Sequence, residues 1–289
     1  MTDLRYESPK TTEAAVALLA DGGQMARVFA GGTDLLVQMH EEMIEPTLLV
    51  DIKNIQETRE ISFEPDFVRI GAAVTGAELS ENDKLVAMWP GVVEAVELIG
   101  SYQVQGRATI AGNLCNASPA ADSVPAMIAA KAIVCIAGPN GAREIPVEQM
   151  PVSPGKTSLS QGEFVTSILL PNRPERAGDA YLRFIPRTEM DIAVVGVGVS
   201  VAINADGTCA SALLALGAVS ATAKLVGAAS NILVGKKLDD NVLEALAAAA
   251  SDACSPIDDK RGTIEFRTKV AGVLACREAK IAWQRAENN

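Results

Sequence analysis

The feature that most restricts the fold is a strand, loop, helix and strand pattern within residues 26–52. The letters ARVFA indicate a first strand, TDLLVQMHEE a helix and TLLVDI a second strand. Such a unit places the loop and the start of the helix at the edge of a sheet, where a ligand can bind. We therefore expect a chain that mixes strands and helices and has a candidate ligand loop near Gly31.

The rest of the chain continues this α+β pattern. A helix capped by Thr11 or Thr12 is expected to end at residues 22–23, where two glycines suit a left-handed stop. Short strands and helices then alternate as far as residue 171. Three strands are predicted between residues 180 and 219, and helices from there to the C-terminus.

A segment without periodicity separates two parts of the chain. Residues 171–179 (PNRPERAGD) combine proline, glycine and charge, as linkers do. The length of 289 residues also suits two domains better than one. We predict a first domain over 1–175, with subdomains at about 1–58 and 59–175, and a second over 176–289 made of a three-stranded sheet with helices.

Composition and charge exclude several classes of function. The formal net charge of -11 would repel nucleic acid and anionic lipid, because both are bound through Lys and Arg that neutralise phosphates. The first ten residues, MTDLRYESPK, lack the apolar core of a signal peptide. The longest uncharged apolar stretch, residues 192–203, is well short of the roughly 20 residues that span a bilayer. We expect a soluble cytoplasmic protein with no nucleic-acid partner and no membrane insertion.

The cysteines and the single histidine argue against catalysis by side chains alone. The five cysteines are scattered singly, without the close pairs that bind zinc or iron–sulfur clusters. His40 alone cannot form a histidine metal site, and no G-x-S-x-G motif accompanies it. We therefore expect no metal and no catalytic side chain here, and a bound organic cofactor as the carrier of any chemistry.

Two glycine-bearing segments carry the functional signal, and the first is residues 27–35 (RVFAGGTDL). Gly31 and Gly32 lie between the predicted strand and helix, where their N–H groups and the helix dipole can face a diphosphate. Thr33 adds a hydroxyl donor. Taken alone, this segment is equally compatible with an ordinary strand-to-helix turn.

The second segment, residues 106–122 (GRATIAGNLCNASPAAD), is rich in small and amide-bearing residues. These residues offer hydrogen-bond donors and acceptors without bulk, as an extended polar ligand requires. We interpret the segment as a ligand-binding loop, with a purely structural loop as the alternative. Neither segment has the pattern of a Walker A motif or of a dinucleotide-binding GxGxxG.

Three motifs in this order resemble one family: AGGTDLL, then TIAGNLCNASPAAD, then YLRFIPRTEMDIAVVGVGVSV. Together they are similar to the FAD-binding medium subunits of the xanthine dehydrogenase and carbon monoxide dehydrogenase family, over nearly the whole chain. The resemblance implies an FAD-binding domain of the vanillyl-alcohol oxidase and MurB (PCMH-like) type. A C-terminal domain like that of the CO dehydrogenase flavoprotein would follow it.

The resemblance also implies that FAD is bound non-covalently, and by which residues. The first segment and part of the second would surround the FAD diphosphate and ribityl chain, and two later strand residues would lie beside the cofactor. The predicted cofactor-binding residues are Arg27, Val28, Phe29, Ala30, Gly31, Gly32, Thr33, Asp34, Leu35, Ala108, Thr109, Gly112, Asn113, Asn116, Asp122, Phe164, Val165, Arg183, Arg187 and Asp191.

By the same resemblance, Arg183 would lie near the flavin ring and Asp122 would be an acidic FAD contact. Arg187 and Asp191 would help to close the site, although without the resemblance they are typical of an exposed ion pair. A cation beside the ring would stabilise the negative charge that builds up when the flavin is reduced. Ala111 stands where the family commonly has glycine, so this position is expected to avoid a left-handed backbone.

The resemblance further implies partner subunits. The chain has no cysteine run for [2Fe–2S] clusters and is too short to hold the molybdopterin domain as well. These cofactors are therefore expected on an iron–sulfur small subunit and a molybdopterin large subunit, in one heterotrimer or a dimer of heterotrimers. Electrons would pass from the iron–sulfur centres through FAD to an external acceptor, and the substrate and the acceptor stay open.

Two alternative functions are also compatible with the sequence. One is a self-sufficient flavin oxidase of the same fold, which would often tether FAD through histidine or cysteine. His40, however, is typical of a solvated surface residue. The other is a nucleotide-binding assembly module without redox turnover.

Overall fold

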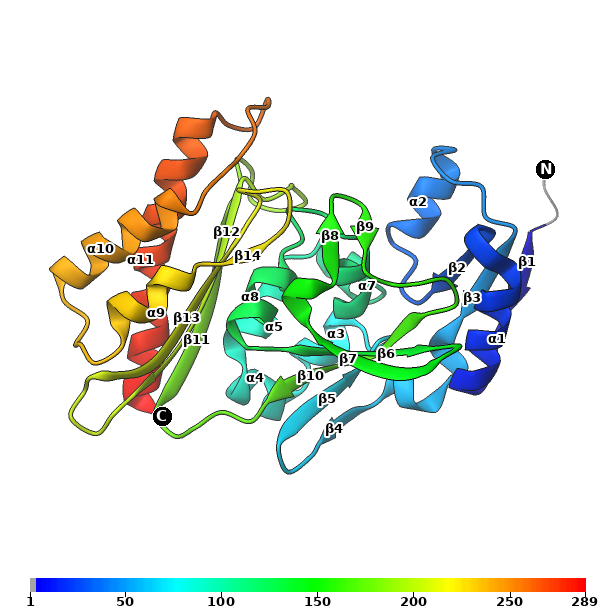
Figure 1. The fold of residues 1–289 in the computed structure, drawn as a ribbon, viewed down its shortest axis with the longest axis horizontal. Coiled ribbons are helices and arrows are strands. Elements are labelled where there is room, and N and C mark those ends of the chain that lie inside the picture. Colours follow the sequence, from blue (N-terminus) through cyan, green and yellow to red (C-terminus); the bar gives the residue numbers. More distant parts are fainter. Residues whose placement is uncertain (1–3) are drawn as a thin grey trace.

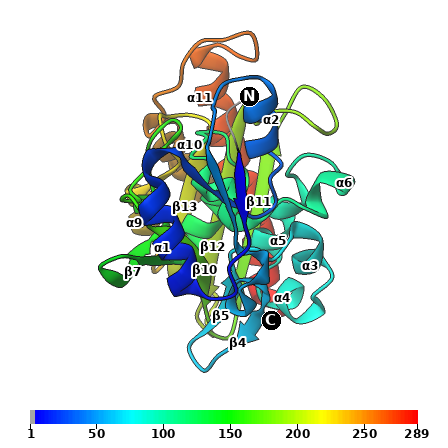
Figure 2. The same ribbon diagram turned by 90° about the vertical axis from the view of Figure 1, so that its right-hand side faces the viewer.

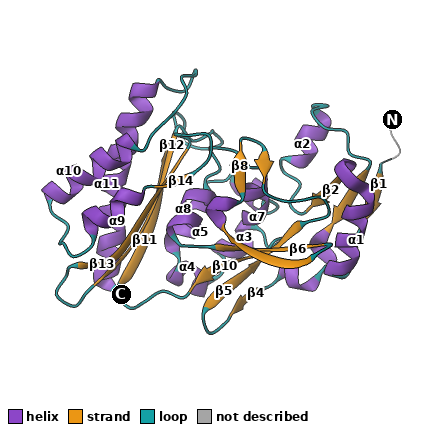
Figure 3. Ribbon diagram, viewed as in Figure 1, coloured by secondary structure: helices purple, strands orange, loops and turns teal. Residues whose placement is uncertain are grey.

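The computed structural model describes residues 4–289 as an elongated molecule with three larger sheets placed one after another along its length and one small two-stranded sheet (Figure 1). The first three residues of the predicted 1–175 domain lie outside the described residues. None of the described helices is both long and apolar enough to cross a membrane. The mixed α+β class expected from the sequence is confirmed (Figure 3).

The N-terminal sheet is small and parallel, with the strand order β1-β3-β2. Its buried residues Leu48 and Val50 lie in the central strand, and α1 packs on the sheet at the near side in Figure 2. The Thr11 hydroxyl caps α1 by accepting a hydrogen bond from Ala14 N at 3.2 Å, as the sequence predicts. The elements are β1 (Arg5–Glu7), α1 (Thr12–Gly22), β2 (Ala26–Phe29), α2 (Leu35–His40) and β3 (Leu48–Asp51).

The middle sheet is antiparallel, with the order β4-β5-β10-β6-β7, and a layer of short helices separates it from the C-terminal sheet. Its central strand β10 is mostly buried and pairs with β5 on one side and β6 on the other. A small β8–β9 pair lies apart from it. The elements are β4 (Ile61–Phe63), β5 (Phe67–Gly71), α3 (Gly76–Ser80), α4 (Asp83–Met88), α5 (Pro90–Glu97), α6 (Tyr102–Gln105), α7 (Ile110–Cys115), α8 (Ser123–Ala129), β6 (Ile133–Gly138), β7 (Gly141–Pro146), β8 (Pro151–Ser153), β9 (Lys156–Thr157) and β10 (Phe164–Pro171).

The second glycine-bearing segment is not the continuous loop that the sequence suggests, because it contains helix α7. Thr109 caps this helix by accepting a hydrogen bond from Gly112 N at 2.9 Å. Two residues of the helix, Ile110 and Leu114, have fully buried side chains. Burial of this apolar pair offsets the poor helix propensity of glycine and asparagine at the next positions. Ala111 has helical backbone angles, as its departure from the family pattern implies.

The C-terminal sheet has the strand order β11-β12-β13-β14, so the prediction of three strands was one strand short. The missed strand β14 has only two residues, too few to show periodicity. Strand β11 also begins at Ala177, inside the expected linker. Helix α11 packs across β11 and β12, while α5 and α8 of the middle layer pack on this sheet from the other side. The elements are β11 (Ala177–Phe184), β12 (Val195–Ile203), β13 (Cys209–Gly217), β14 (Lys224–Leu225), α9 (Gly227–Leu233), α10 (Asp240–Asp252) and α11 (Ile264–Asn288).

The outer edge of β11 is closed by side chains rather than by another strand. Arg285 Nη1 donates to the Asp179 carbonyl at 2.7 Å, and Asn289 Nδ2 donates to the Ala177 carbonyl at 2.9 Å. Glu94 accepts from Tyr181 N at 3.4 Å and forms an ion pair with Arg285. These contacts satisfy backbone groups of an edge strand and join α5 to the end of α11.

Glu278 of α11 is fully buried near this edge. Within residues 4–289, neither of its carboxylate oxygens has a hydrogen-bond partner. Burial, reinforced by the nearby carboxylates of Glu94 and Asp179, raises the pKa of Glu278 to about 8. The side chain is therefore a neutral acid at pH 7 in the folded protein.

This arrangement predicts a pH-dependent loss of stability that Glu278→Gln removes. The unfolded carboxyl ionises above about pH 4.5, whereas the folded one keeps its proton up to about pH 8. The free energy of unfolding therefore decreases as the pH rises through this window. Thermal melts at pH 5 and pH 8 should show a stability advantage of Glu278→Gln that grows with pH. An advantage that stays constant over this range would contradict the assignment.

Candidate functional site

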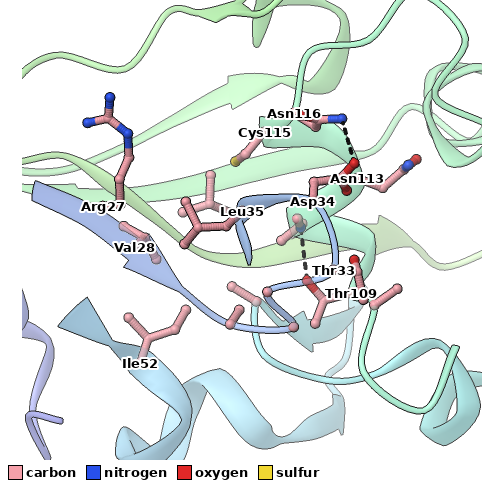
Figure 4. Close-up of a pocket in the computed structure, with 18 of the residues that line it drawn as sticks. Arg27, Val28, Thr33, Asp34, Leu35, Ile52, Thr109, Asn113, Cys115 and Asn116 are labelled. Atoms are coloured by element: carbon pink, nitrogen blue, oxygen red, sulfur yellow. Dashed lines mark hydrogen bonds between the residues drawn. The ribbon is translucent and has the colours of Figure 1, made fainter. Parts of the chain in front are cut away.

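The two glycine-bearing segments lie against each other and form one pocket (Figure 4). The first segment passes from β2 into α2, and the second contributes the start and one face of α7. The pocket holds a cavity of about 260 Å³ between them. Predicted residues that line it are Arg27, Val28, Ala30, Gly31, Gly32, Thr33, Asp34, Leu35, Ala108, Thr109, Gly112, Asn113, Asn116, Phe164 and Val165.

Gly31 and Gly32 have different structural roles. A Cβ at Gly31 would lie 2.1 Å from the carbonyl oxygen of Arg107, so the missing side chain lets the two segments touch. Gly32 has a φ of +74°, a left-handed conformation that glycine adopts without strain. Helices α2 and α7 have only six residues each. Helices this short contribute little dipole. The loop N–H groups and the small polar side chains are therefore the groups best suited to hold an anion here.

A chain of hydrogen bonds joins the two segments on the polar side of the pocket. Asn116 Nδ2 donates to Asp34 Oδ1 at 3.2 Å, as Figure 4 shows, and Gln38 Nε2 donates to Asn116 Oδ1 at 3.3 Å. Burial raises the pKa of Asp34 above its ordinary value. Asn113 also lines the pocket, and its Oδ1 accepts from Ser123 Oγ at 2.7 Å, which leaves its Nδ2 group available as a donor.

The opposite side of the pocket is apolar. Ile52, Leu159 and Phe164 line it together with Val28 and Leu35 of the first segment. Cys115 also lines the pocket, and burial raises the pKa of its thiol to about 12. A thiol with this pKa stays protonated at neutral pH and is a poor nucleophile.

Phe29 is a predicted site residue that does not line the pocket, because its ring lies against the turn at Gly32. A Cβ at Gly32 would meet the Phe29 ring at 2.4 Å. The Nζ atom of Lys53 lies 4.0 Å from the centroid of the same ring and donates to the Ala30 carbonyl at 3.1 Å. Phe29 therefore supports the turn.

Asp122 and Arg183 also lie outside this pocket and form a buried ion pair. Arg183 Nη1 donates to Asp122 Oδ2 at 2.7 Å, and the two side chains are 4% and 9% exposed, respectively. The Tyr181 hydroxyl donates to the other carboxylate oxygen at 3.0 Å. Burial raises the pKa of Asp122 to about 6 despite the opposing effect of Arg183. Among the described residues, Arg183 Nε has no hydrogen-bond partner.

The pocket and this ion pair are adjacent. Ile99 lines the pocket, whereas its neighbours Leu98 and Gly100 line a second hollow that also contains Arg183. Asp122 directly precedes Ser123, whose hydroxyl donates a hydrogen bond to Asn113 Oδ1. The pocket and the hollow that contains Arg183 are therefore lined by consecutive residues of the same segment, 98–100.

Arg187 and Asp191 form the ion pair that is typical of their spacing. Arg187 Nε contacts Asp191 Oδ2 at 3.1 Å, and the Arg187 side chain is 68% exposed. The Asp191 carbonyl accepts a hydrogen bond from Arg183 Nη1 at 3.3 Å. This second contact connects the exposed pair to the buried one.

Several residues that line the pocket were not among those predicted. Gln38 lies one helical turn after Asp34, so helical spacing could have indicated that it lines the pocket. Ala111 and Cys115 lie within the second motif, so their position in the sequence could have indicated the same. The others come from distant segments, and only the tertiary fold brings them here. The unpredicted lining residues are Gln38, Ile52, Ala72, Ile99, Ala111, Cys115 and Leu159.

Two further observations concern other kinds of site. His40 is exposed at the end of α2 and does not line the pocket. Over residues 4–289, no group of three or more His, Cys, Asp and Glu side chains is arranged to hold a metal ion.

Comparison with known proteins matches both parts of the chain. Residues 2–173 match the family described as the FAD binding domain in molybdopterin dehydrogenase. Residues 180–281 match the CO dehydrogenase flavoprotein C-terminal domain.

Individual relatives match over nearly their whole length. The carbon monoxide dehydrogenase medium chain of Hydrogenophaga pseudoflava is 33% identical over 280 residues, which cover 97% of each chain. The corresponding chain of Afipia carboxidovorans is 34% identical over 283 residues and 98% of each chain.

The solved structure of carbon monoxide dehydrogenase from Hydrogenophaga pseudoflava agrees in fold. One of its chains matches with a TM-score of 0.93 at 33% identity, over 98% of both chains. The chain therefore belongs to the family of FAD-binding medium subunits of molybdenum-containing dehydrogenases.

Proposed function

We propose that this chain is the electron-transferring FAD subunit of a heteromeric molybdenum hydroxylase. The observation that carries the proposal is the single pocket built by the two glycine-bearing segments, in a chain whose family binds FAD. The relatives are named as medium chains, which supports a small iron–sulfur and a large molybdopterin partner. When bound, FAD supplies reversible two-electron chemistry between such iron–sulfur centres and an external acceptor.

The residues of the pocket fit FAD in chemistry. The loop N–H groups, Thr33 and Asn113 would hold the diphosphate and ribityl chain, while the apolar wall would contact an aromatic ring. A cavity of about 260 Å³ is at the low end of ligand pockets, which run from roughly 300 to 1,000 Å³. We therefore infer that FAD extends beyond it into the adjoining hollow at Arg183.

The charge that would face the flavin is that of a pair rather than of a lone cation. Arg183 is neutralised by Asp122 when that carboxyl is ionised, and its Nε remains as a buried donor. A donor held in this way stabilises negative charge on a neighbouring ring without solvent rearrangement. Arg187 and Asp191 would order the loop above it.

We also propose a division of the chain near residue 175. The two family matches end at residue 173 and begin at residue 180, which supports this boundary. The buried apolar residues also fall into two main clusters. One comes mostly from the first part, with Tyr181, Ala215 and Ala223 from the second, and the other comes entirely from the second part.

The visible spectrum of the purified chain tests the function directly. We expect bound flavin absorption that bleaches with dithionite and that is released into solution by acid precipitation, because no nucleophile suited to a covalent link lines the pocket among the described residues. A colourless protein that does not take up added FAD would overturn the proposal. A yellow acid precipitate would instead indicate tethered flavin and the self-sufficient oxidase.

Thr33→Val should weaken FAD binding without loss of fold. Within residues 4–289 the Thr33 hydroxyl makes no side-chain hydrogen bond, so its removal affects a ligand more than the fold. Loss of one hydrogen bond to a charged group should raise the Kd for FAD about tenfold. Thr222→Val, a partly buried threonine of the C-terminal part, is the matched control for fluorescence titrations with FAD. Equal Kd values in the two variants would contradict the assignment.

Opposite substitutions in the Asp122–Arg183 pair should shift the flavin potential in opposite directions. Asp122→Asn leaves Arg183 uncompensated and should raise the potential, by about 30 mV for about 1.4 kcal/mol of extra stabilisation. Arg183→Ala should lower the potential by less, because the unpaired buried Asp122 takes up a proton more readily. Redox titration at pH 7.5 of folded, FAD-loaded variants measures both changes. Shifts of the same sign would place the flavin elsewhere.

A further inference from the structure

Asp122, Arg183 and Tyr181 form a buried cluster, the Asp122 cluster. Tyr181 is the one of these three residues to which the resemblance assigns no role. It lies in β11 and is 2% exposed, and its hydroxyl donates to Asp122 Oδ1 at 3.0 Å. Arg183 Nη1 donates to Oδ2 at 2.7 Å, so each carboxylate oxygen of Asp122 has its own donor. Two donors from one strand hold the carboxylate in a single orientation.

The Tyr181 hydroxyl has little room to move away from Asp122. On the neighbouring strand β12, a Cβ at Gly196 would lie 2.5 Å from the hydroxyl oxygen, so only glycine leaves space for it there. Helix α8, which begins directly after Asp122, packs on β11 and β12. The β12 backbone at Gly196 therefore confines the hydroxyl on that side.

The hydroxyl is also locked as a donor. Burial and the adjacent Asp122 carboxylate raise the pKa of Tyr181 well above its ordinary value, so it keeps its proton. The other charged groups near it are Arg183 on the same strand, Glu278 from α11 and Glu94 from α5, whose carboxylate accepts from Tyr181 N. The Arg187–Asp191 pair touches the cluster only through the Asp191 carbonyl.

We propose that Tyr181 is a positioning residue for the flavin site: its hydroxyl keeps Asp122 ionised against Arg183 and so sets the net charge beside the flavin. This inference rests on the proposed function, in which Arg183 lies next to the ring. Tyr181 acts through Asp122 and need not touch the cofactor.

The physical consequence is confined to a range of pH. Burial already raises the pKa of Asp122 to about 6, and the hydrogen bond from Tyr181 opposes that rise. Without the hydroxyl the pKa should rise by about one pH unit, because a hydrogen bond to a charged group is lost. Between about pH 6 and pH 7 the variant would then carry a protonated Asp122 and an uncompensated Arg183.

The test compares flavin potentials of the FAD-loaded full chain and its Tyr181→Phe variant from pH 5 to pH 8.5. Phenylalanine keeps the buried ring and removes only the hydroxyl. We expect the variant to have the higher potential only between about pH 6 and pH 7, with the two curves meeting above and below that range. A difference of constant size at all pH values would mean that Tyr181 is merely structural, and no difference would refute its role.

Two controls sharpen this test. Tyr6→Phe removes a tyrosine hydroxyl bonded to Asp51 in the N-terminal sheet and should leave the inflection near pH 6 in place. Measuring both proteins in a Glu278→Gln background removes a second buried carboxyl, whose pKa of about 8 falls inside the scanned range. The buried Asp179, whose pKa is also raised to about 6, is present in both proteins and contributes equally to the two curves.

A measurement on the flavin-free chain separates failure of this inference from failure of the proposed function. Carboxyl carbon NMR, with Asp122→Asn for assignment, reports the Asp122 titration directly. An Asp122 titration that does not move in Tyr181→Phe sinks the inference even if FAD binds. A titration that moves while the potential does not would leave Tyr181 controlling Asp122 at a place remote from the flavin, and would overturn the link to the cofactor.

Discussion

The buried ion pair between Asp122 and Arg183 is the interaction on which the rest of the site depends. Moving both charges out of water is costly, and their attraction repays this only when hydrogen bonds satisfy the remaining polar atoms. Tyr181 supplies such a bond on one side, and the Asp191 carbonyl supplies another on Arg183. The pair thereby fixes the start of α8 against β11, and Ser123 carries that constraint to Asn113 in the pocket.

The same combination of tyrosine, aspartate and cation occurs near the first glycine-bearing segment. There Tyr6 donates to Asp51, and Lys53 forms an ion pair with Asp51 at 2.8 Å while also donating to the Ala30 carbonyl. Both carboxylates are buried, and burial alone would raise the pKa of each. At Asp51 the hydrogen bonds from Lys53 and Tyr6 together outweigh burial and lower the pKa, whereas at Asp122 burial outweighs Arg183 and Tyr181 and raises it. One arrangement of side chains thus gives two different electrostatic environments at the two segments.

How much could be predicted from sequence depended on whether a feature is local. The Thr11 cap, the strand at residues 26–29 and the glycine loop after it follow from neighbouring residues, and the structure has them. Helix α7 was missed because its glycine and asparagine oppose helix formation and only burial of Ile110 and Leu114 stabilises it. Ile99 and Leu159 enter the pocket through the tertiary fold alone. The proximity of Asp122 to Arg183, separated by sixty residues of chain, has no local signal either and was implied only by family resemblance.

The side chains that cover β11 also bear on how this protein avoids unwanted association. An open sheet edge can template pairing with a strand from another molecule, which is a route to aggregation. Here one edge of the C-terminal sheet is occupied by Glu94, Arg285 and Asn289, and the opposite edge ends in the two-residue strand β14. Neither edge offers a long run of unpaired backbone groups. Growth of this sheet by addition of a strand from another molecule is therefore disfavoured at both edges.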